Sequence, residues 1–153
     1  MEPDRLNKLD KDPNFIMRTA IFQANFKNLD SIREYVARAA KDAGFDDAGV
    51  YAIQLAADEA SSNIIEHAYK KEDDGEIECT CSLDGDNLVL VFRDHGLSYE
   101  PDSVPEPKLT GKLNKRKIGG LGLYLIRHLM DEVHYESFDE AGNVLTLKKR
   151  IVG

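Results

Sequence analysis

Residues 76–94 constrain the fold more than any other stretch of this chain. Two segments rich in branched and aromatic side chains, EIECTCSL and NLVLVFRD, are separated by Asp84-Gly85-Asp86. Turn-forming residues between two such segments are a strong short-range indication of a β-hairpin. Since an isolated hairpin is only marginally stable in water, other elements of the chain must pack against one of its faces.

The other segments predict what covers the hairpin. FIMRTAIFQANF near the N-terminus predicts another strand, and DEVHYESF and NVLTLKKRI predict a second hairpin. Apolar residues at helical spacing predict three helices, over about 31–43, 46–69 and 121–130. The expected fold is an α/β two-layer sandwich, in which a mixed, mainly antiparallel sheet of about five strands carries about three helices on one face.

The length of the chain, 153 residues, is that of one domain that buries a core without metals or disulfides. We expect a flexible polar tail over 1–13 and a single domain over 14–153, because no repeat or low-complexity tract is visible. Residues 98–118 combine prolines, glycine and basic side chains with little apolar periodicity. A long irregular segment of this kind inside a compact domain is usually functional or disordered.

The composition excludes several functions. Hydrophobic residues make up 42% and charged residues 31% of a chain with a formal net charge of -8, which is typical of a soluble globular protein. The acidic balance disfavours binding to nucleic acid or anionic membranes and permits a protein partner with a basic patch. No signal peptide or membrane-spanning run occurs, so we expect a cytoplasmic protein. Cys79 and Cys81 are interpreted as buried core residues rather than as a disulfide or zinc site.

Glu59 and Asn63 stand four residues apart in LAADEASSNIIEHAY and therefore share one face of the second predicted helix. An asparagine oxygen suits Mg²⁺, which keeps several waters and takes its other ligands from phosphates. A glutamate one turn away is placed to accept a proton from an attacking hydroxyl or water. Taken alone, such a pair is more often a solvated polar patch on an ordinary helix.

Asp94 and Gly96 end the apolar strand that closes the first hairpin. A carboxylate at this position is suited to accept a hydrogen bond from a planar donor such as an adenine amino group, and a nearby glycine lets the backbone come close to the ring. The simpler interpretation is a strand-end turn in which the aspartate side chain bonds its own backbone.

Gly119, Gly120 and Gly122 open the third predicted helix. Glycines at a helix start leave backbone amides free to face a phosphate, and the helix dipole favours the anion. The spacing matches neither the dinucleotide-binding fingerprint nor a P-loop. The alternative interpretation is a flexible loop that leads into a helix.

Order and spacing join these three motifs. A helix with Glu and Asn, a strand ending in Asp-x-Gly, an irregular segment and a glycine-rich helix start resemble the N-box, G1 box, lid and G2 box of the GHKL (Bergerat-fold) ATPases. The resemblance covers nearly the whole chain after the tail. Within that superfamily, EASSNIIEHAY and GGLGLYLIRHLMDEV are most similar to the anti-sigma-factor serine kinases.

The resemblance implies a role for each matching residue. Asn63 would hold Mg²⁺, and Glu59 would be the catalytic base or would orient the nucleophile. Backbone amides of three glycines would line the triphosphate of ATP: Gly119, Gly120 and Gly122. The lid would cover 98–118, and its basic residues 112–117 would be within reach of the phosphates.

Adenine recognition follows from the same resemblance. Asp94 would accept from the adenine amino group, Gly96 would let the base sit close, and Thr146 on the last strand would place a hydroxyl near the ring. One position departs from the family pattern, because Ser98 stands where the G1 box usually has a second glycine. This departure puts the geometry of the lid in question more than the recognition of adenine.

The function implied by the resemblance is ATP-dependent phosphorylation of a Ser or Thr on an anti-sigma-factor antagonist, coupled to sequestration of a sigma factor. ATP and Mg²⁺ are the expected cofactors, Arg33 on the first helix is the expected partner contact, and the expected assembly is a homodimer. One alternative is a non-catalytic ATP-binding module that sequesters a protein partner. Another is the catalytic domain of a sensor histidine kinase, which is disfavoured because only about a dozen residues precede the first strand.

Overall fold

A computed structural model describes residues 15–69, 75–97, 124–138 and 142–152. Five strands form one open sheet with the order β1-β2-β3-β5-β4. The strands are β1 (Met17–Gln23), β2 (Glu76–Asp84), β3 (Asn87–Asp94), β4 (Glu132–Phe138) and β5 (Gly142–Arg150). The predicted two-layer sandwich is confirmed, although every pairing among these strands is antiparallel and the sheet is not mixed.

The hairpin predicted at 76–94 forms as β2 and β3. Asp84 pairs with Asn87, and Gly85 adopts a φ of 60° in the tight turn between them. Alternate side chains of β3 are buried, among them Leu88, Leu90 and Phe92. This alternation assigns one face of the sheet to the core, and none of the described helices covers the other face.

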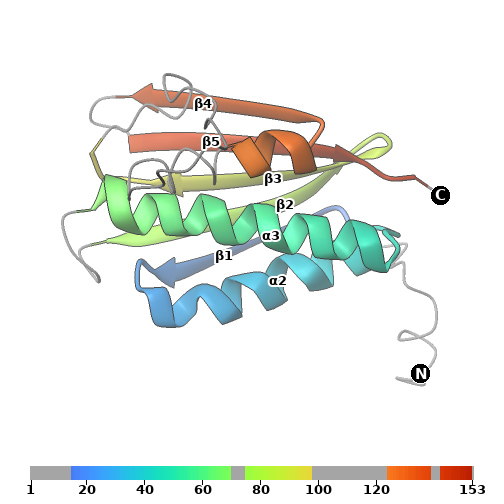
Figure 1. The fold of residues 1–153 in the computed structure, drawn as a ribbon, viewed down its shortest axis with the longest axis horizontal. Helices are drawn as coiled ribbons and strands as arrows, with labels where there is room; N and C mark the ends of the chain where they lie inside the picture. The colour runs from blue at the N-terminus through green and yellow to red at the C-terminus, as the bar shows by residue number, and fades with distance from the viewer. Residues whose placement is uncertain (1–14, 70–74, 98–123, 139–141, 153) are drawn as a thin grey trace, which may run out of the picture.

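The helices lie on one face of the sheet (Figure 1). A short 3-10 turn, η1 (Phe26–Asn28), leads into α2 (Leu29–Asp42), which begins slightly before the predicted start. Next comes α3 (Asp47–Asn63), whose first turn is capped by Asp46, with Gly49 N donating to Asp46 Oδ1 at 2.8 Å. A further helical segment covers 124–129.

The long helix predicted over 46–69 differs from the observed one near its end. Regular α-helix stops at Asn63, and a π-helical turn, η2 (Ile64–Ala68), follows. Tertiary contacts account for the change, because Leu97 N donates to the Ala68 carbonyl and the Tyr69 hydroxyl hydrogen-bonds to Glu76 of β2 and to His95 just after β3. Turns of this kind often mark functional sites.

The core lies between the helix layer and the inner face of the sheet. Ile32 and Val36 of α2 and Ile53 of α3 are almost fully buried. Their neighbours in the same cluster come from the strands and from helix 124–129: Ile77, Leu88, Leu90, Phe92, Leu147 and Ile126. Cys79 and Cys81 are buried free thiols of this core, as predicted. Among the described helices, none is long and apolar enough to cross a membrane.

Candidate functional site

One end of the molecule brings together three elements that carry the predicted motifs. The C-terminal end of α3, the last residues of β3 and the first residues of β5 all lie there (Figure 1). Hydrogen bonds tie these elements to one another. Leu97 N, just after β3, donates to the carbonyl of Ala68 at the end of η2, and Asp94 pairs with Asn143 of β5.

Glu59 and Asn63 lie on α3, as predicted, and occupy its last turns because the helix ends earlier than predicted. The Asn63 side chain is 6% exposed, and no hydrogen bond to it is found among the described residues. Glu59 is half-buried, and its pKa is raised, chiefly by burial and then by the negative charges of Asp58 and Glu66. An amide oxygen and a carboxylate of raised pKa are therefore both available on the same helix end.

Asp58, next to Glu59, is held by a residue of α2. Arg33 Nε donates to both carboxylate oxygens of Asp58, at 3.2 and 3.0 Å, and Arg33 also forms an ion pair with Asp30 at 2.7 Å. The forked contact fixes α2 against α3 close to Glu59. Arg33 was predicted as a partner contact, and the structure places it in a contact within the chain.

Asp94 is 1% exposed, and its two carboxylate oxygens differ in their surroundings. Oδ1 accepts from Gly96 N at 2.9 Å and from Asn143 Nδ2 at 2.8 Å. Oδ2 is buried and has no hydrogen-bond partner among the described residues. Burial raises the pKa of Asp94, while these hydrogen bonds act in the opposite direction. The strand-end turn therefore uses only Oδ1 and leaves a buried acceptor for an outside donor.

Asn143 is the site residue that sequence reasoning missed. It is 2% exposed, and its Nδ2 also donates to the Leu97 carbonyl at 3.0 Å. Ser137 Oγ lies 3.0 Å from Asn143 Oδ1, which fixes the orientation of the amide. The available indication was the preceding Gly142, whose φ of 94° and close approach to the Asp94 carbonyl require a glycine.

Gly96 also approaches a backbone closely. A Cβ at this position would clash with the carbonyl of Ala68, so the absence of a side chain is required by contact with η2. The neighbouring His95 N donates to the Tyr69 hydroxyl at 3.0 Å, and that hydroxyl donates to the Glu76 carbonyl at 2.6 Å. The turn after β3 is therefore fixed from two sides, which positions Asp94.

The structure does not bring Thr146 together with Asp94. Thr146 pairs with Val91 on the sheet face that points away from the helices, whereas Asp94 is on the helix-facing side. The other predicted residues, Ser98, Gly119, Gly120 and Gly122 with the segments 98–118 and 112–117, lie outside the described residues.

The side-chain oxygens described at this end of the molecule suit a bound nucleotide better than a metal ion held by protein ligands alone. No group of three or more His, Cys, Asp or Glu side chains within the described ranges is arranged to hold a metal ion. A single buried amide oxygen, that of Asn63, suits a cation ligated mainly by phosphates and water. The buried Oδ2 of Asp94, which has no partner among the described residues, suits a hydrogen-bond donor from a ligand.

Comparison with known proteins agrees with this arrangement. The model of the histidine kinase-like ATPase domain matches residues 22–149. The chain belongs to this family. It is 36% identical over 121 residues to the serine-protein kinase RsbW of Bacillus cereus (strain B4264), covering 76% of this chain and 74% of that protein. The serine-protein kinase RsbW of Listeria monocytogenes serotype 4b (strain F2365) is 35% identical over 113 residues, 71% of each chain. The GHKL resemblance is thereby confirmed.

Proposed function

We propose that this protein is an ATP-dependent protein serine/threonine kinase that acts as an anti-sigma factor and phosphorylates an anti-sigma-factor antagonist. The observation that carries the proposal is that two carboxylates lie on elements that meet at one end of the molecule (Figure 1): Glu59, whose pKa is raised, and Asp94, whose buried Oδ2 has no partner among the described residues. Relatives named serine-protein kinase RsbW, matched over more than two thirds of both chains, support the same activity.

Asp94 is the proposed recognition point for adenine. Its Oδ2 would accept from the exocyclic amino group, and Asn143 would hold the carboxylate in the orientation that makes this possible. Guanine carries a carbonyl oxygen at that position, which would face the carboxylate as a second acceptor. The site should therefore select ATP over GTP.

Asn63 is the proposed protein ligand of Mg²⁺, which would neutralise the triphosphate when bound. Glu59, one helical turn earlier, would hold the incoming Ser or Thr hydroxyl and accept its proton at a carboxylate oxygen. The backbone amides of Gly119, Gly120 and Gly122 and a lid over 98–118 would enclose the phosphates, within a single domain over 14–153. This role requires positioning and charge stabilisation rather than covalent chemistry by the protein.

Phosphorylation would then decide which partner is held. A phosphate on the antagonist adds negative charge, which disfavours its contact with an acidic kinase and leaves the kinase free to hold the sigma factor. Arg33 would contribute to the partner surface by exchanging one of its internal carboxylates for one of the partner. We further propose that the protein acts in the cytoplasm as a homodimer.

The deciding experiment is transfer of labelled phosphate from [γ-³²P]ATP to a purified candidate antagonist, with Mg²⁺ or with EDTA. We expect Mg²⁺-dependent labelling of one Ser or Thr, identified by mass spectrometry. ATP binding without labelling of any antagonist that co-purifies with the protein would instead support a non-catalytic ATP-binding module that sequesters its partner.

A further inference from the structure

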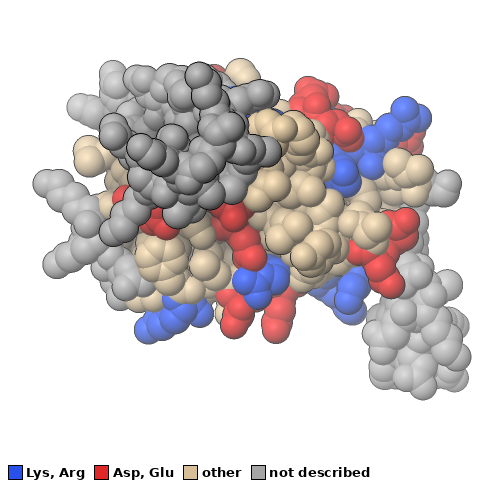
Figure 2. Space-filling model, viewed as in Figure 1, with Lys and Arg blue, Asp and Glu red and all other residues tan. Residues whose placement is uncertain are grey.

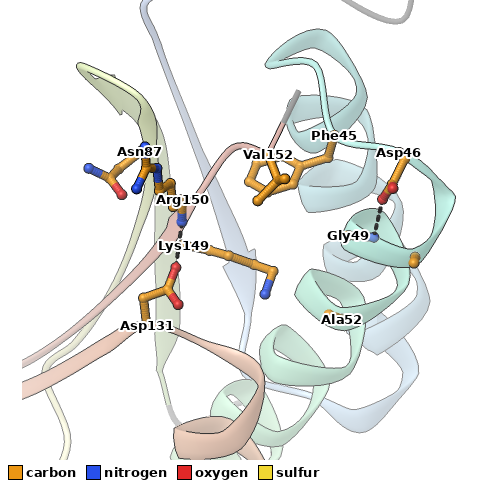
Figure 3. A pocket seen from close by; sticks show the side chains of 10 residues that line it. Phe45, Asp46, Gly49, Ala52, Asn87, Asp131, Lys149, Arg150 and Val152 are labelled. Carbon is orange, nitrogen blue, oxygen red and sulfur yellow. Dashed lines mark hydrogen bonds between the residues drawn. The ribbon is translucent and has the colours of Figure 1, made fainter.

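A pocket of about 540 Å³ opens at the N-terminal end of α3, between that helix and the end of β5 (Figure 3). Apolar side chains of Phe45, Ala52 and Val152 form much of its lining. Its volume falls in the range of small-molecule sites, about 300–1,000 Å³. Along α3 it lies about 20 Å from Asn63, at a rise of about 1.5 Å per residue, so it is separate from the proposed nucleotide site.

The hollow has a cause in the sequence of α3. The first turns of the helix present Ala48, Gly49 and Ala52 to the pocket, and these side chains are too small to fill the space in front of β5. A larger residue is not tolerated at Gly49 without rearrangement, because a Cβ there would lie 2.7 Å from Cδ1 of Phe45. The space is therefore a consequence of the packing between Phe45 and α3.

Lys149 places a positive charge in this space. It follows Leu145 and Leu147 at every second position of β5, and so it belongs to the row of side chains that faces the helices. Figure 3 shows its side chain extending from the strand toward α3. Its Nζ donates to the Leu129 carbonyl at 2.8 Å, and no carboxylate among the described residues forms an ion pair with it.

The adjacent lysine shows the difference. Lys148 is on the opposite face of the sheet, where its Nζ lies 3.4 Å from Asp84 Oδ2 and 3.9 Å from Glu132 Oε2. Lysine is rarely turned toward a protein interior without a counter-charge, because removing the ammonium from water is costly. Lys149, unlike Lys148, is thus placed to receive an anion from outside the chain.

Two carboxylates also line the pocket, and both have partners in the local backbone. Asp46 accepts from Gly49 N at 2.8 Å as the cap of α3, and Asp131 Oδ2 accepts from Arg150 N at 2.7 Å. Both contacts are drawn in Figure 3. Among the described residues, the ammonium of Lys149 uses one of its three donors, in the bond to the Leu129 carbonyl, and Arg150 adds a second cation to the lining.

We propose that this pocket binds a small amphipathic anion. A carboxylate or similar monoanionic head would accept hydrogen bonds from Lys149 Nζ, and a short apolar body would lie against Phe45, Ala52 and Val152. The apolar lining supplies most of the contact area and the lysine supplies selectivity for the sign of the charge, which is the usual division of labour in small-molecule sites.

Octanoate is a suitable probe, with octanol and octylammonium as neutral and cationic counterparts. Titration of the ¹⁵N-labelled protein, followed by amide chemical shifts, should move residues 48–52 and 149–152 with octanoate and leave residues near Asn63 unaffected. Octanoate should bind about tenfold more tightly than octanol, the scale of one hydrogen bond to a charged group. Equal or stronger binding of octanol or octylammonium, or no shift with octanoate, would overturn the proposal.

Two substitutions test the pocket from its two walls, one at Lys149 on β5 and one at Ala52 on α3. Lys149→Met keeps the length of the side chain and should weaken octanoate binding about tenfold while leaving octanol unchanged. Lys148→Met, which removes a lysine from the other face, is the matched control and should bind octanoate like the wild type. Ala52→Phe should block binding of both octanoate and octanol by filling the hollow while Lys149 is still present. Circular dichroism must show that each variant is folded, and unchanged octanoate binding in folded Lys149→Met or Ala52→Phe would refute the site.

Discussion

The N-terminal end of α3 follows the rules for a helix start, whereas its C-terminal end departs from the rules for a helix stop. Asp46 caps the first turn by a 2.8 Å hydrogen bond from Gly49 N. At the other end the helix passes into a π-helical turn directly after Asn63. The irregular helix geometry occurs next to Glu59 and Asn63. It therefore marks the end of α3 to which we assign the catalytic and metal-binding residues.

The β-strands show the same difference between their two ends. Asp84 and Asn87 close a regular two-residue hairpin at one end of β3. At the other end, Asp94 is buried with one carboxylate oxygen bonded and the other without a partner among the described residues. A buried acceptor left without a donor costs stability, of the order of 1–3 kcal/mol. Its retention is accounted for if a ligand supplies the donor.

Among the proposed variants, Glu59→Gln should have the largest effect, and that effect is on the rate of phosphoryl transfer at the C-terminal end of α3. The substitution keeps the shape of the side chain and removes the proton acceptor, so phosphoryl transfer should fall about 10²–10⁴-fold. ATP affinity should be retained or slightly increased, because a carboxylate near the γ-phosphate repels it. Transfer rate and calorimetric affinity are measured on the same preparation.

Glu34→Gln is the control for that variant, because Glu34 is exposed on α2 and is not among the charges that raise the pKa of Glu59. It should transfer phosphate at close to the wild-type rate. Wild-type transfer by Glu59→Gln itself would show that Glu59 is not the base, and loss of ATP binding in that variant would show that its effect is structural.

Asn63→Ala should remove the dependence of nucleotide affinity on Mg²⁺. The wild-type protein should bind ATP more tightly with Mg²⁺ than with EDTA, since the Asn63 oxygen would ligate the ion together with the phosphates. Calorimetry under both conditions measures the ratio. Asn87→Ala, at the end of β3 away from Asp94, should leave the ratio as in the wild type. A ratio that survives in Asn63→Ala would assign the metal to other residues.

Asn143→Ala tests the residue that holds Asp94. Without Nδ2 the carboxylate loses its 2.8 Å hydrogen bond, and ATP affinity should weaken by about 1–3 kcal/mol. The preference for ATP over GTP should shrink with it, because a carboxylate held only by Gly96 N is less firmly oriented toward the base. Thr146→Ala is the control, on the opposite face of the sheet. If only Thr146→Ala changes the preference, adenine is recognised elsewhere.

The contrast between Asn143 and Thr146 also shows what sequence reasoning can reach. The five strands and the turn at Gly85 were predictable, because alternation and turn residues are local properties. Asp94 was found because it ends a strand. The partner of Asp94 depends on the register between β3 and β5, which are 49 residues apart at this contact. Positions 143 and 146 differ by an odd number, so they face opposite sides of the sheet.

The π-helical turn after Asn63 was beyond prediction for a similar reason. Apolar spacing continues through Ile64 and Ala68, and this favours one uninterrupted helix over 46–69. The interruption arises from the hydrogen bonds of Ala68 and Tyr69 to segments that follow later in the chain. Tertiary contacts override local periodicity where the site is built.

The smallest expected effect is a pH-dependent change in the folding stability of Glu59→Gln. The pKa of Glu59 is raised in the folded protein, mainly by burial, so its charged form is less favourable there than in the unfolded chain. The folded state therefore favours the protonated form of Glu59. This contribution to folding stability is fully present below the unfolded-state pKa of about 4.3, and it is lost as the pH rises through the folded-state pKa. At pH 7 the charged carboxylate therefore costs stability, and Glu59→Gln removes that cost. Because Glu59 is only half-buried, the gain should stay below about 1 kcal/mol, or at most about 4 °C in Tm.

Thermal unfolding of Glu59→Gln and wild type across pH 4 to 8 measures the effect. The variant should unfold at a higher temperature at pH 7, and the difference should vanish toward pH 4, where the wild-type carboxyl is protonated and resembles the amide. Glu34→Gln, an exposed position on α2, should show no such pH-dependent gain. A constant difference at every pH would mean that shape or hydrogen bonding, rather than charge, distinguishes the variant. A loss of stability at pH 7 would mean that a cation stabilises the Glu59 carboxylate. The charged form would then not be disfavoured at the end of α3, and the proposed role of Glu59 as a proton acceptor would lose this support.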